Sequence, residues 1–246
     1  MSNAISSSMR ARLAALLALV VAGQAHGADC RPQALPAFDA AGTWVHTPLS
    51  KLKRDTAYTV SKVEGQSVLH ATANGSASAW VLLERFDIAA TPLLEWRWRT
   101  PALIKSAANE DPKREDAPLR VIVGFGGDKS KLPDEEQRYF ARIKRLTGRD
   151  MPYAMLMYIW DNKNPVDRVV PSAHTSRVKM IVAESGGAGV GAWRSYRRNL
   201  AQDFERAFGE KPGQLLGFGL MTDTDNTGED AEGFYGPLRL TCDGAK

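Results

Sequence analysis

The chain is poor in the residues that most often build metal and nucleophile sites, with only two cysteines and four histidines among its 246 residues. The histidines of the expected mature chain are scattered, at His46, His70 and His174, and none has the spacing of a zinc ligand pair. The sequence also contains no G-x-S-x-G motif, which marks the nucleophile turn of many serine hydrolases. These absences disfavour a zinc site and leave hydrolysis by an activated serine with little support.

Long apolar runs are also missing, apart from one near the N-terminus. Residues 13–22 are apolar, but about ten residues are too few to span a bilayer. Arg10 and Arg12 precede this run and small residues follow it, which is the pattern of a secretory signal peptide. We therefore expect residues 1–28 to be a signal peptide, with residues 1–8 as an N-terminal extension of it.

The charge of the chain gives no sign of a nucleic-acid partner. The formal charge is +4, and it falls to +2 when Arg10 and Arg12 leave with the signal peptide. Nucleic-acid-binding domains carry a clear excess of clustered basic residues. We therefore expect no nucleic-acid partner, and no membrane span once the signal peptide is removed; the oligomeric state stays open.

The two cysteines lie near opposite ends of the expected mature chain, at Cys30 and Cys242. In an oxidising compartment such a pair is expected to form a disulfide, which contributes about 4–5 kcal/mol in the chain-entropy treatment of so long a loop. The bond would place the first and last strands side by side. Asp29 stands where a lipobox needs a small residue, so no lipid anchor is expected at Cys30. The chain is therefore predicted to be exported, and to be periplasmic or secreted.

Most segments after residue 40 have the pattern of β-strands. Residues 93–99 alternate between apolar and charged side chains, which is the period of a half-buried strand. Residues 154–160 are apolar on both faces, which favours a central strand. Turn-rich segments separate the runs, and this predicts a mainly β fold, one antiparallel β-sandwich or jelly-roll domain over residues 29–246 with one or two short helical insertions. The predicted strands are residues 67–71, 79–86, 93–99, 119–125, 154–160, 177–184, 215–221 and 234–240, and the predicted helices are residues 133–148 and 200–208.

Five motifs carry a resemblance to a known family. They are EWRWR at residues 95–99, EDAPLRV at 115–121, YIWDN at 158–162, RVKMIV at 177–182 and MTDTDNTG at 221–228. With these motifs the chain resembles the bacterial DUF3047 family over nearly the whole mature sequence, and the last motif is the most specific. The closing strands also resemble carbohydrate-binding jelly rolls of the galactose-binding-like type, in which residues 193–204 would be a strand that leads into a short helix. These resemblances imply a β-sandwich fold and an exported protein, while the family itself has no assigned activity to carry over.

The segment between the last two predicted strands is crowded with acidic and amide side chains. Asp223, Asp225 and Gly228 occupy the first, third and sixth positions of a calcium loop. Phe234 stands where the twelfth position needs a bidentate acid, and a strand rather than a helix precedes the loop, so an EF-hand is rejected. A calcium ion held by Asp223, Asp225 and Asn226 in an irregular β-loop is one interpretation. A solvated turn shaped by Asn226 and Gly228 is the other, and it is the one we favour.

A second polar motif ends the strand predicted over residues 154–160. Trp160, Asp161 and Asn162 combine an aromatic face with a carboxylate and an amide, a set that suits the apolar face and the hydroxyl groups of a sugar. The same residues also fit an ordinary capped turn, with the Trp160 ring filling the edge of the sandwich. If the sugar interpretation holds, this motif can share a rim with Asp223 and Asp225.

Charged residues of two further strands raise another pair of alternatives. Glu95, Arg97 and Arg99 are expected to share one sheet face with Asp116 and Arg120. Arginine and carboxylate on adjacent strands usually form a ladder of salt bridges, which is the interpretation we favour. The alternative is a binding face on which Arg97 or Arg120 pairs with an anionic ligand.

Together these patterns predict an exported protein that binds a carbohydrate or another envelope ligand without transforming it. Calcium is the only candidate cofactor, and the predicted ligand-binding residues are Trp160, Asp161, Asn162, Asp223, Asp225 and Asn226. One alternative is a glycan-active hydrolase or lyase that uses two carboxylates drawn from Asp116, Asp161 and Asp223. Another is an envelope assembly or scaffold protein whose partner is a second protein, since a fold alone does not separate binding from chemistry.

Overall fold

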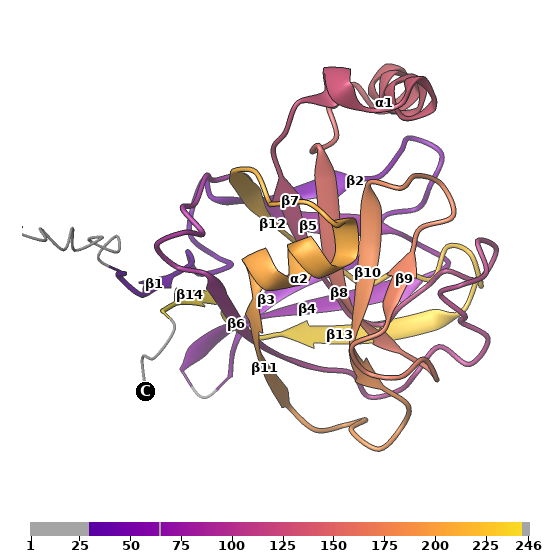
Figure 1. The fold of residues 1–246 in the computed structure, drawn as a ribbon. Helices are drawn as coiled ribbons and strands as arrows, with labels where there is room; N and C mark the ends of the chain where they lie inside the picture. Colours follow the sequence, from indigo (N-terminus) through magenta and orange to yellow (C-terminus); the bar gives the residue numbers. More distant parts are fainter. Residues whose placement is uncertain (1–29, 64, 243–246) are drawn as a thin grey trace, which may run out of the picture.

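The computed structural model describes residues 30–63 and 65–242, and its strands form two sheets of seven strands each (Figure 1). The strands of sheet A are β1 (Gln33–Ala34), β3 (Ala57–Val63), β4 (Gln66–Asn74), β6 (Leu93–Arg99), β11 (Arg194–Asn199), β13 (Asp230–Tyr235) and β14 (Arg239–Thr241). The strands of sheet B are β2 (Trp44–Pro48), β5 (Ser78–Leu82), β7 (Arg120–Phe125), β8 (Ala154–Asp161), β9 (Val169–Pro171), β10 (Val178–Ser185) and β12 (Leu215–Met221).

The order of the strands explains how the sheets are built. Sheet A runs β1-β14-β6-β13-β4-β3, with β11 paired to the other edge of β6, and sheet B runs β2-β5-β12-β7-β8-β10-β9. The described strands pair antiparallel except for β8 and β10, which are parallel because the connection between them, which contains β9, returns the chain to the starting end. The central position predicted for residues 154–160 is confirmed, since β8 lies between β7 and β10.

The core lies between the two sheets because the strands turn their apolar residues inward. On β6, Leu94, Trp96 and Trp98 are buried, whereas the charged residues between them are half-buried on the outer face. The ring centroid of Trp96 lies 4.9 Å from that of Tyr158 on β8, so the aromatic side chains of the two sheets meet directly. The predicted mainly β sandwich is therefore confirmed.

The shorter of the two helices completes this core. α2 (Leu200–Phe208) begins after Asn199, whose side chain accepts a hydrogen bond from the backbone N–H of Gln202, and it ends at Gly209 in the left-handed conformation. Its residues Leu200 and Phe204 are buried in the core. These bounds agree with the predicted helix over residues 200–208.

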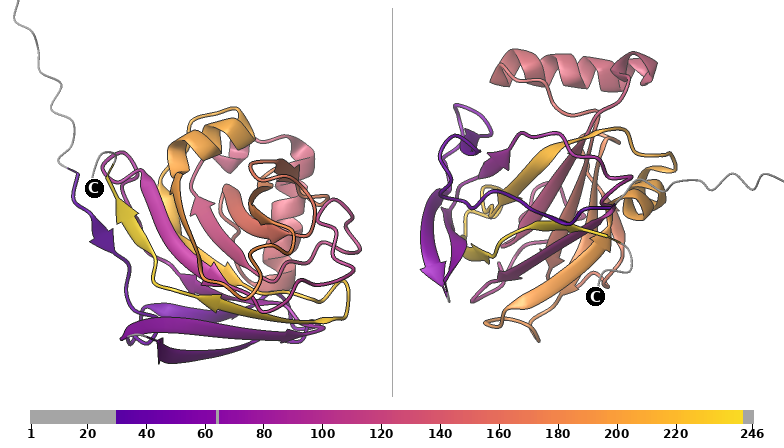
Figure 2. Two further views of the ribbon diagram at one scale, coloured as in Figure 1. Left: turned by 90° about the horizontal axis from the view of Figure 1, so that it is seen from below. Right: turned by 90° about the vertical axis from the view of Figure 1, so that its left-hand side faces the viewer.

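The longer helix lies outside the sandwich. A short 3-10 turn at Lys129–Lys131 leads into α1 (Asp134–Thr147), which ends at the left-handed Gly148. Phe140 is the one residue of α1 that is fully buried. Figures 1 and 2 show α1 standing apart from the strands, over the outer face of sheet B.

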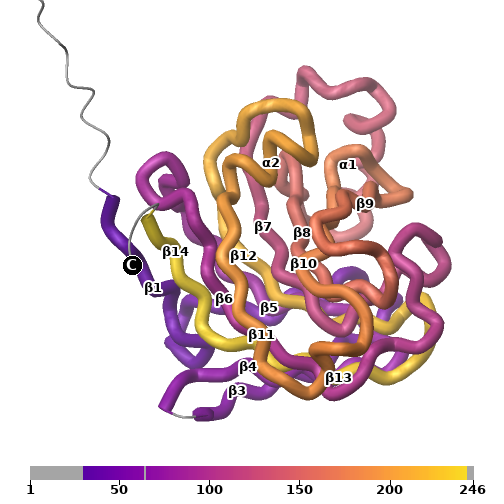
Figure 3. Tube along the Cα trace, turned by 60° about the horizontal axis from the view of Figure 1, so that its bottom comes forward, coloured from indigo at the N-terminus to yellow at the C-terminus, as the bar shows by residue number. Residues whose placement is uncertain are grey.

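The two ends of the described chain lie side by side, as Figure 3 shows. β1 pairs antiparallel with β14, and the disulfide joins Cys30 to Cys242 with their Cα atoms 5.8 Å apart. Both the disulfide and the adjacency of the terminal strands were expected from the sequence. The predicted signal peptide, residues 1–28, lies outside the described residues. No described helix has the length and apolar character needed to cross a bilayer.

The structure departs from the predicted strands at two kinds of places. The predicted strand over residues 234–240 is two strands, because β13 ends at Tyr235 and Gly236 and Pro237 separate it from β14; proline has no N–H to donate to a sheet. Four further strands were not predicted: β9 is only three residues long, and β1, β2 and β3 form from segments whose side chains are largely polar or half-exposed. Such strands give little of the apolar alternation on which the prediction depends. β11 and α2 lie where the resemblance to galactose-binding-like jelly rolls implied a strand that leads into a short helix.

Candidate functional site

The acidic loop that follows β12 is folded around a buried ion pair. Arg120 donates from Nε to Asp223 Oδ1 at 2.6 Å and from Nη2 to Asp223 Oδ2 at 3.0 Å. Arg120 is 1% exposed and Asp223 is 2% exposed. Bidentate pairs of this kind are among the strongest hydrogen bonds in proteins. Both oxygens of Asp223 are therefore already occupied.

Burial governs the protonation of this pair. It raises the pKa of the Asp223 carboxyl to about 7, although Arg120 lowers it, and the nearby carboxylates of Asp116 and Asp225 raise it further. Burial lowers the pKa of the Arg120 guanidinium, but Asp223 and Glu115 outweigh that effect and hold the pKa above its ordinary value. A raised carboxyl pKa often marks a functional site, but this carboxyl is sealed from solvent.

Asp116 holds the same loop in place through hydrogen bonds. It is 1% exposed, its Oδ2 accepts a hydrogen bond from the backbone N–H of Thr227 at 2.7 Å, and its Oδ1 accepts one from Asn226 Nδ2 at 3.1 Å. The Asn226 amide also donates to the carbonyl of Glu115 at 3.2 Å. These contacts fix the turn, as the favoured interpretation of the loop expects.

The carboxylates of this loop are close enough together to be considered for a metal ion. One oxygen each from Asp116, Asp223 and Asp225 lies within 4.8 Å of the others, and among the described residues this is the one group of that kind. However, the ammonium of Lys53 pairs with Asp225, and the other two carboxylates are held by Arg120 and by N–H donors. Because calcium needs six to eight oxygens directed at it, these residues fit the ion poorly. Calcium stays a prediction.

The second predicted motif begins with a core residue. Trp160 is 0% exposed and belongs to the main core cluster. Its indole Nε1 donates a hydrogen bond to the carbonyl of Gly186 at 3.0 Å. The ring fills the sandwich, as the capped-turn interpretation expects, and in this conformation it has no face open to a sugar.

Asp161 and Asn162 bind neighbouring loops. Asp161 is 2% exposed and accepts hydrogen bonds from Asn109 Nδ2 at 2.8 Å and from the backbone N–H groups of Lys163 and Asn164 at 2.8 and 2.7 Å. Burial raises the pKa of its carboxyl, but these donors outweigh burial and leave the pKa below its ordinary value. Asn162 Nδ2 donates to two carbonyls of the loop that precedes β7, at 2.7 and 3.0 Å. Asp161 does not join the carboxylate group of the acidic loop.

The expectation that the charged residues of β6 share a face with Asp116 and Arg120 was wrong. Glu95, Arg97 and Arg99 lie on the outer face of sheet A, whereas Arg120 belongs to β7 of sheet B. The core separates the two sets. The cause is the topology, because β6 pairs with β11, β13 and β14 and makes no pair with β7.

A polar hollow lies on the outer face of sheet A, where the edge of β6 is shared by two strands. β14 pairs with Leu93–Glu95 and β13 with Trp98–Arg99, so residues 236–238 cross the gap between them. The hollow has a volume of about 430 Å³. We call it the sheet A hollow, and its lining residues are Gln66, Glu95, Trp96, Arg97, Ser195, Tyr196, Arg197, Pro237 and Arg239.

Aromatic rings and a fourth arginine lie beside this hollow. The guanidinium carbon of Arg97 is 4.7 Å from the ring centroid of Trp193. That of Arg99 is 5.5 Å from Trp193 and 4.4 Å from Phe234, and the Phe234 ring stacks on His70 at 4.3 Å. At these distances the guanidinium groups attract the ring faces by cation–π interaction, and the three rings are half-buried.

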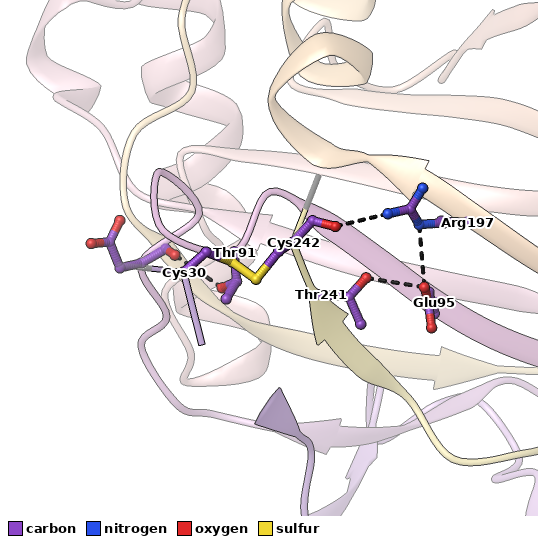
Figure 4. Close-up of a disulfide and its surroundings, with 7 residues drawn as sticks. Cys30, Thr91, Glu95, Arg197, Thr241 and Cys242 are labelled. Atoms are coloured by element: carbon purple, nitrogen blue, oxygen red, sulfur yellow. Dashed lines mark hydrogen bonds and ion pairs between the residues drawn. A yellow bond between two sulfur atoms is a disulfide. The ribbon is translucent and has the colours of Figure 1, made fainter. Parts of the chain in front are cut away.

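The disulfide end of the chain supports one wall of the sheet A hollow, and Figure 4 shows the hydrogen bonds that join Cys242 and Thr241 to Arg197 and Glu95. Arg197 pairs through Nε with Glu95 Oε1 at 3.2 Å and donates from Nη2 to the carbonyl of Cys242 at 2.7 Å. Thr241 Oγ1 donates to Glu95 Oε1 at 3.0 Å. The Cys30–Cys242 bond therefore fixes the strand end on which Arg197 and Glu95 depend.

The sequence contains part of the signal for this hollow. The alternation of residues 93–99 places Glu95 and Arg97 on one face, and Arg97 was one of two arginines considered for an anionic ligand. Arg197 and Arg239 come from strands more than 90 residues later in the chain, and no local pattern links them to β6.

The family described as "Protein of unknown function (DUF3047)" matches residues 42–239. No curated protein matches the chain.

Several solved structures match the chain at low identity. The glycoside hydrolase domain of Endo-D from Streptococcus pneumoniae aligns over 82% of this chain at 9% identity with a TM-score of 0.38, and the chain spans only 22% of that protein. Endoglucanase 3 of family GH12 from Trichoderma harzianum aligns over 85% of this chain and 96% of its own at 8% identity, with a TM-score of 0.42. A lectin from Bauhinia forficata in complex with GalNAc aligns over 85% of this chain and 97% of its own at 12% identity, with a TM-score of 0.36. Likeness of this degree says nothing about the ligand or the activity of this chain.

Proposed function

The chain belongs to the DUF3047 family, whose description gives no function, and from the geometry we propose that it is an exported protein that binds an acidic glycan without transforming it. The sheet A hollow is the proposed binding site. The observation that carries the proposal is the convergence of Arg97, Arg197 and Arg239 on one hollow beside half-buried aromatic rings.

The chemistry of the lining suits a sugar acid. Guanidinium groups bind carboxylate, sulfate or phosphate through two parallel hydrogen bonds. Ser195 and Gln66 carry hydroxyl and amide groups suited to sugar hydroxyls, and Glu95 adds an acceptor. Trp193 contacts Arg97 of this lining and is half-buried, so its ring lies near enough to pack against the apolar face of a neighbouring sugar unit.

Binding is favoured over catalysis by the placement of the carboxylates. Glycosidases use two carboxyl groups that flank the substrate, about 5–10 Å apart, and Glu95 is the one carboxylate that lines the sheet A hollow. The alternative acids Asp116, Asp161 and Asp223 are each no more than 2% exposed. A hydrolase or lyase that used them would first have to open the loops that cover them.

Export is part of the proposal and is supported by the disulfide. Disulfides persist in oxidising compartments and are uncommon in the cytosol, and Cys30 and Cys242 form one here. A periplasmic or secreted protein would also meet the acidic glycans of a cell envelope.

The proposal is tested by titration calorimetry with two probes, an oligosaccharide of hexuronic acids and its neutral hexose counterpart. We expect the acidic probe to bind and the neutral one to bind at least tenfold more weakly, with the difference shrinking in high salt. Arg239→Gln should weaken the acidic probe about tenfold or more, which corresponds to about 1.4 kcal/mol. Arg138→Gln, an exposed arginine on α1, is the matched control. Equal binding of both probes would contradict the proposal.

A further inference from the structure

The outer face of sheet B is apolar where a solvent-facing sheet is usually polar. The strands β5, β12, β7 and β8 place Val81, Gly219, Ile122 and Met157 opposite one another in a single row. The residues of these strands that alternate with this row, such as Leu220 and Leu156, fill the core. An antiparallel sheet with apolar residues on both faces is expected to have something covering its outer face.

A groove runs over this face and beneath α1. Its volume is about 340 Å³, which lies within the range of about 300–1,000 Å³ typical of small-molecule sites. We call it the sheet B groove, and side chains such as Val81, Ile122, Met155, Met157, Leu216 and Met221 line it. Methionine side chains are flexible and polarisable, so they adapt to the shape of an apolar ligand. Leu83, also in the lining, is 81% exposed.

Gly219 forms part of the floor of this groove, opposite Ile122. Gly124 and Gly217 are covered, by Pro152 and by the backbone of Leu82. A Cβ atom at Gly219 would meet nothing closer than the Cβ atom of Ile122 at 3.4 Å, which is ordinary contact. The space above Gly219 is therefore available to a ligand and can also be filled by a substitution.

α1 crosses this face as a strap that is held at both ends. Near its start, Glu136 accepts hydrogen bonds from Thr175 Oγ1 at 2.5 Å and from the backbone N–H of Ser176 at 2.6 Å, next to β10. Just beyond its end, Arg149 Nη1 donates to the carbonyl of Pro48 on β2 at 2.9 Å. β2 and β10 lie on opposite sides of sheet B, and Figure 2 shows the helix lying across the strands. Polar contacts hold the two ends of α1, and Phe140 is its one buried residue. The side of α1 that faces the sheet, with Ile143 and Thr147, therefore has few apolar partners and lines the groove instead.

The charge around the groove selects the kind of ligand. Arg149 is the one basic residue in the groove lining. Arg138, Arg142 and Arg145 of α1 lie on the helix face opposite Ile143 and Thr147, which line the groove, and the first turn of α1 carries three acids. Asp150, which pairs with Lys144 at 2.7 Å, is the one acid in the groove lining. An apolar slot that carries Arg149 in its lining, with its one acid already paired, is complementary to an aliphatic chain with an anionic head group.

We propose that the sheet B groove binds a single aliphatic chain with an anionic head group, the chemistry of a long-chain carboxylate. The chain lies over Gly219 and between the methionines, and the head group lies beside Arg149. The groove is covered on one side by the sheet and on the other by the helix, so it suits a slender chain better than the flat surface of a second protein. This site lies on the opposite sheet from the sheet A hollow, and the two proposals succeed or fail separately.

The test is titration calorimetry of the disulfide-bonded mature protein with octanoate, decanoate and dodecanoate as monomers. Each buried methylene contributes about 0.8 kcal/mol, so two added methylenes should tighten binding about tenfold. Dodecyltrimethylammonium carries the same chain with a cationic head group and should bind at least tenfold more weakly than dodecanoate. Equal affinity along the series of chain lengths would overturn the proposal.

Substitutions locate the site. Gly219→Ile fills the groove and should abolish dodecanoate binding, whereas Thr59→Ile adds similar bulk to an exposed strand of sheet A and should leave it unchanged. If Gly219→Ile does not fold, Met157→Gln places an amide in the groove and should weaken dodecanoate at least tenfold. Arg149→Gln should reduce the preference for the anionic head group.

Two further outcomes would overturn the proposal. Binding to vesicles of phosphatidylcholine and phosphatidylglycerol without any binding of monomeric dodecanoate would make α1 a membrane-surface helix. A wild-type dimer in sedimentation that Gly219→Ile dissociates, again with no dodecanoate binding, would mean that a second copy of the chain covers the groove.

Discussion

Two clusters of arginine and carboxylate in this chain have similar composition and opposite accessibility. Arg120 and Asp223 are buried and close on each other through two hydrogen bonds. Arg197 and Arg239 are exposed beside half-buried Glu95, at the rim of the sheet A hollow. The charged groups of the first cluster pair with each other inside the chain, whereas the arginines of the second cluster are exposed to solvent.

The difference teaches that residue type alone does not identify a binding site. Desolvating a guanidinium and a carboxylate costs several kcal/mol per ion, and a matched pair offsets this cost only when each partner stays in place. Such a pair belongs to the fold and is unavailable to a ligand. Arg197 and Arg239 are exposed and have therefore been desolvated little, so they can still form hydrogen bonds with an incoming anion.

The largest expected effect is from breaking the buried cluster. Asp223→Ala leaves the buried guanidinium of Arg120 without its partner, and we expect the free energy of unfolding to fall by about 3–5 kcal/mol. Arg239→Gln removes a charge from the exposed cluster and should change the free energy of unfolding by less than about 1 kcal/mol. Urea denaturation of both variants measures the contrast, and equal losses would contradict it.

The disulfide comes next, because it supports the exposed cluster and the fold together. Replacing Cys30 and Cys242 by serine should lower the free energy of unfolding by about 2–5 kcal/mol. Since the Cys242 carbonyl holds Arg197, binding of the acidic oligosaccharide should also weaken, even well below the melting temperature. Thermal denaturation and calorimetry of the same sample report both effects; unchanged binding would separate the hollow from the disulfide.

A smaller effect concerns acid stability. The pKa of Asp161 is held below its ordinary value in the folded chain, so its contribution to stability is present above the unfolded pKa of about 3.9 and is lost as the pH falls through the folded pKa. Asp161→Asn should therefore flatten the fall in stability at acid pH. Asp134→Asn, an exposed carboxylate on α1, is the matched control, and denaturation at pH 3 to 6 compares the two variants.

The smallest expected effect is that of calcium. If calcium bound the folded chain, a calcium concentration one hundred times the dissociation constant would stabilise the fold by about 2.7 kcal/mol, or several degrees in melting temperature. Because Arg120, Lys53 and N–H donors already hold the three carboxylates, we expect no shift between excess calcium and EDTA. A rise of several degrees in calcium would restore the acidic loop as a metal site.

Local patterns in the sequence predict much of the fold. The strict alternation of residues 93–99 and the apolar run of residues 215–221 match β6 and β12 at both ends, and the two helices end at Gly148 and Gly209 as their left-handed caps require. β3 alternates only over its first five residues and has no fully buried side chain. It lies at the edge of sheet A, where pairing with β4 supplies the order that its short pattern does not.

The candidate site was harder to predict because it depends on contacts between distant residues. No local pattern around Asp223 indicates that Arg120, 103 positions earlier, donates hydrogen bonds to both of its carboxylate oxygens. The sequence does not distinguish a tryptophan that binds a sugar at a strand end from one that fills the core. In the structure, the packing of the two sheets buries Trp160. The sheet A hollow arises from a break between β13 and β14 that the predicted single strand did not contain.

The measurement that tests the central claim most directly is a titration of the hexuronic acid oligosaccharide against three proteins, wild type, Arg239→Gln and Asp225→Asn. If the sheet A hollow is the binding site, Arg239→Gln should weaken binding about tenfold or more and Asp225→Asn should leave it unchanged. The reverse pattern, with binding lost in Asp225→Asn and retained in Arg239→Gln, would return the site to the acidic loop and contradict the claim.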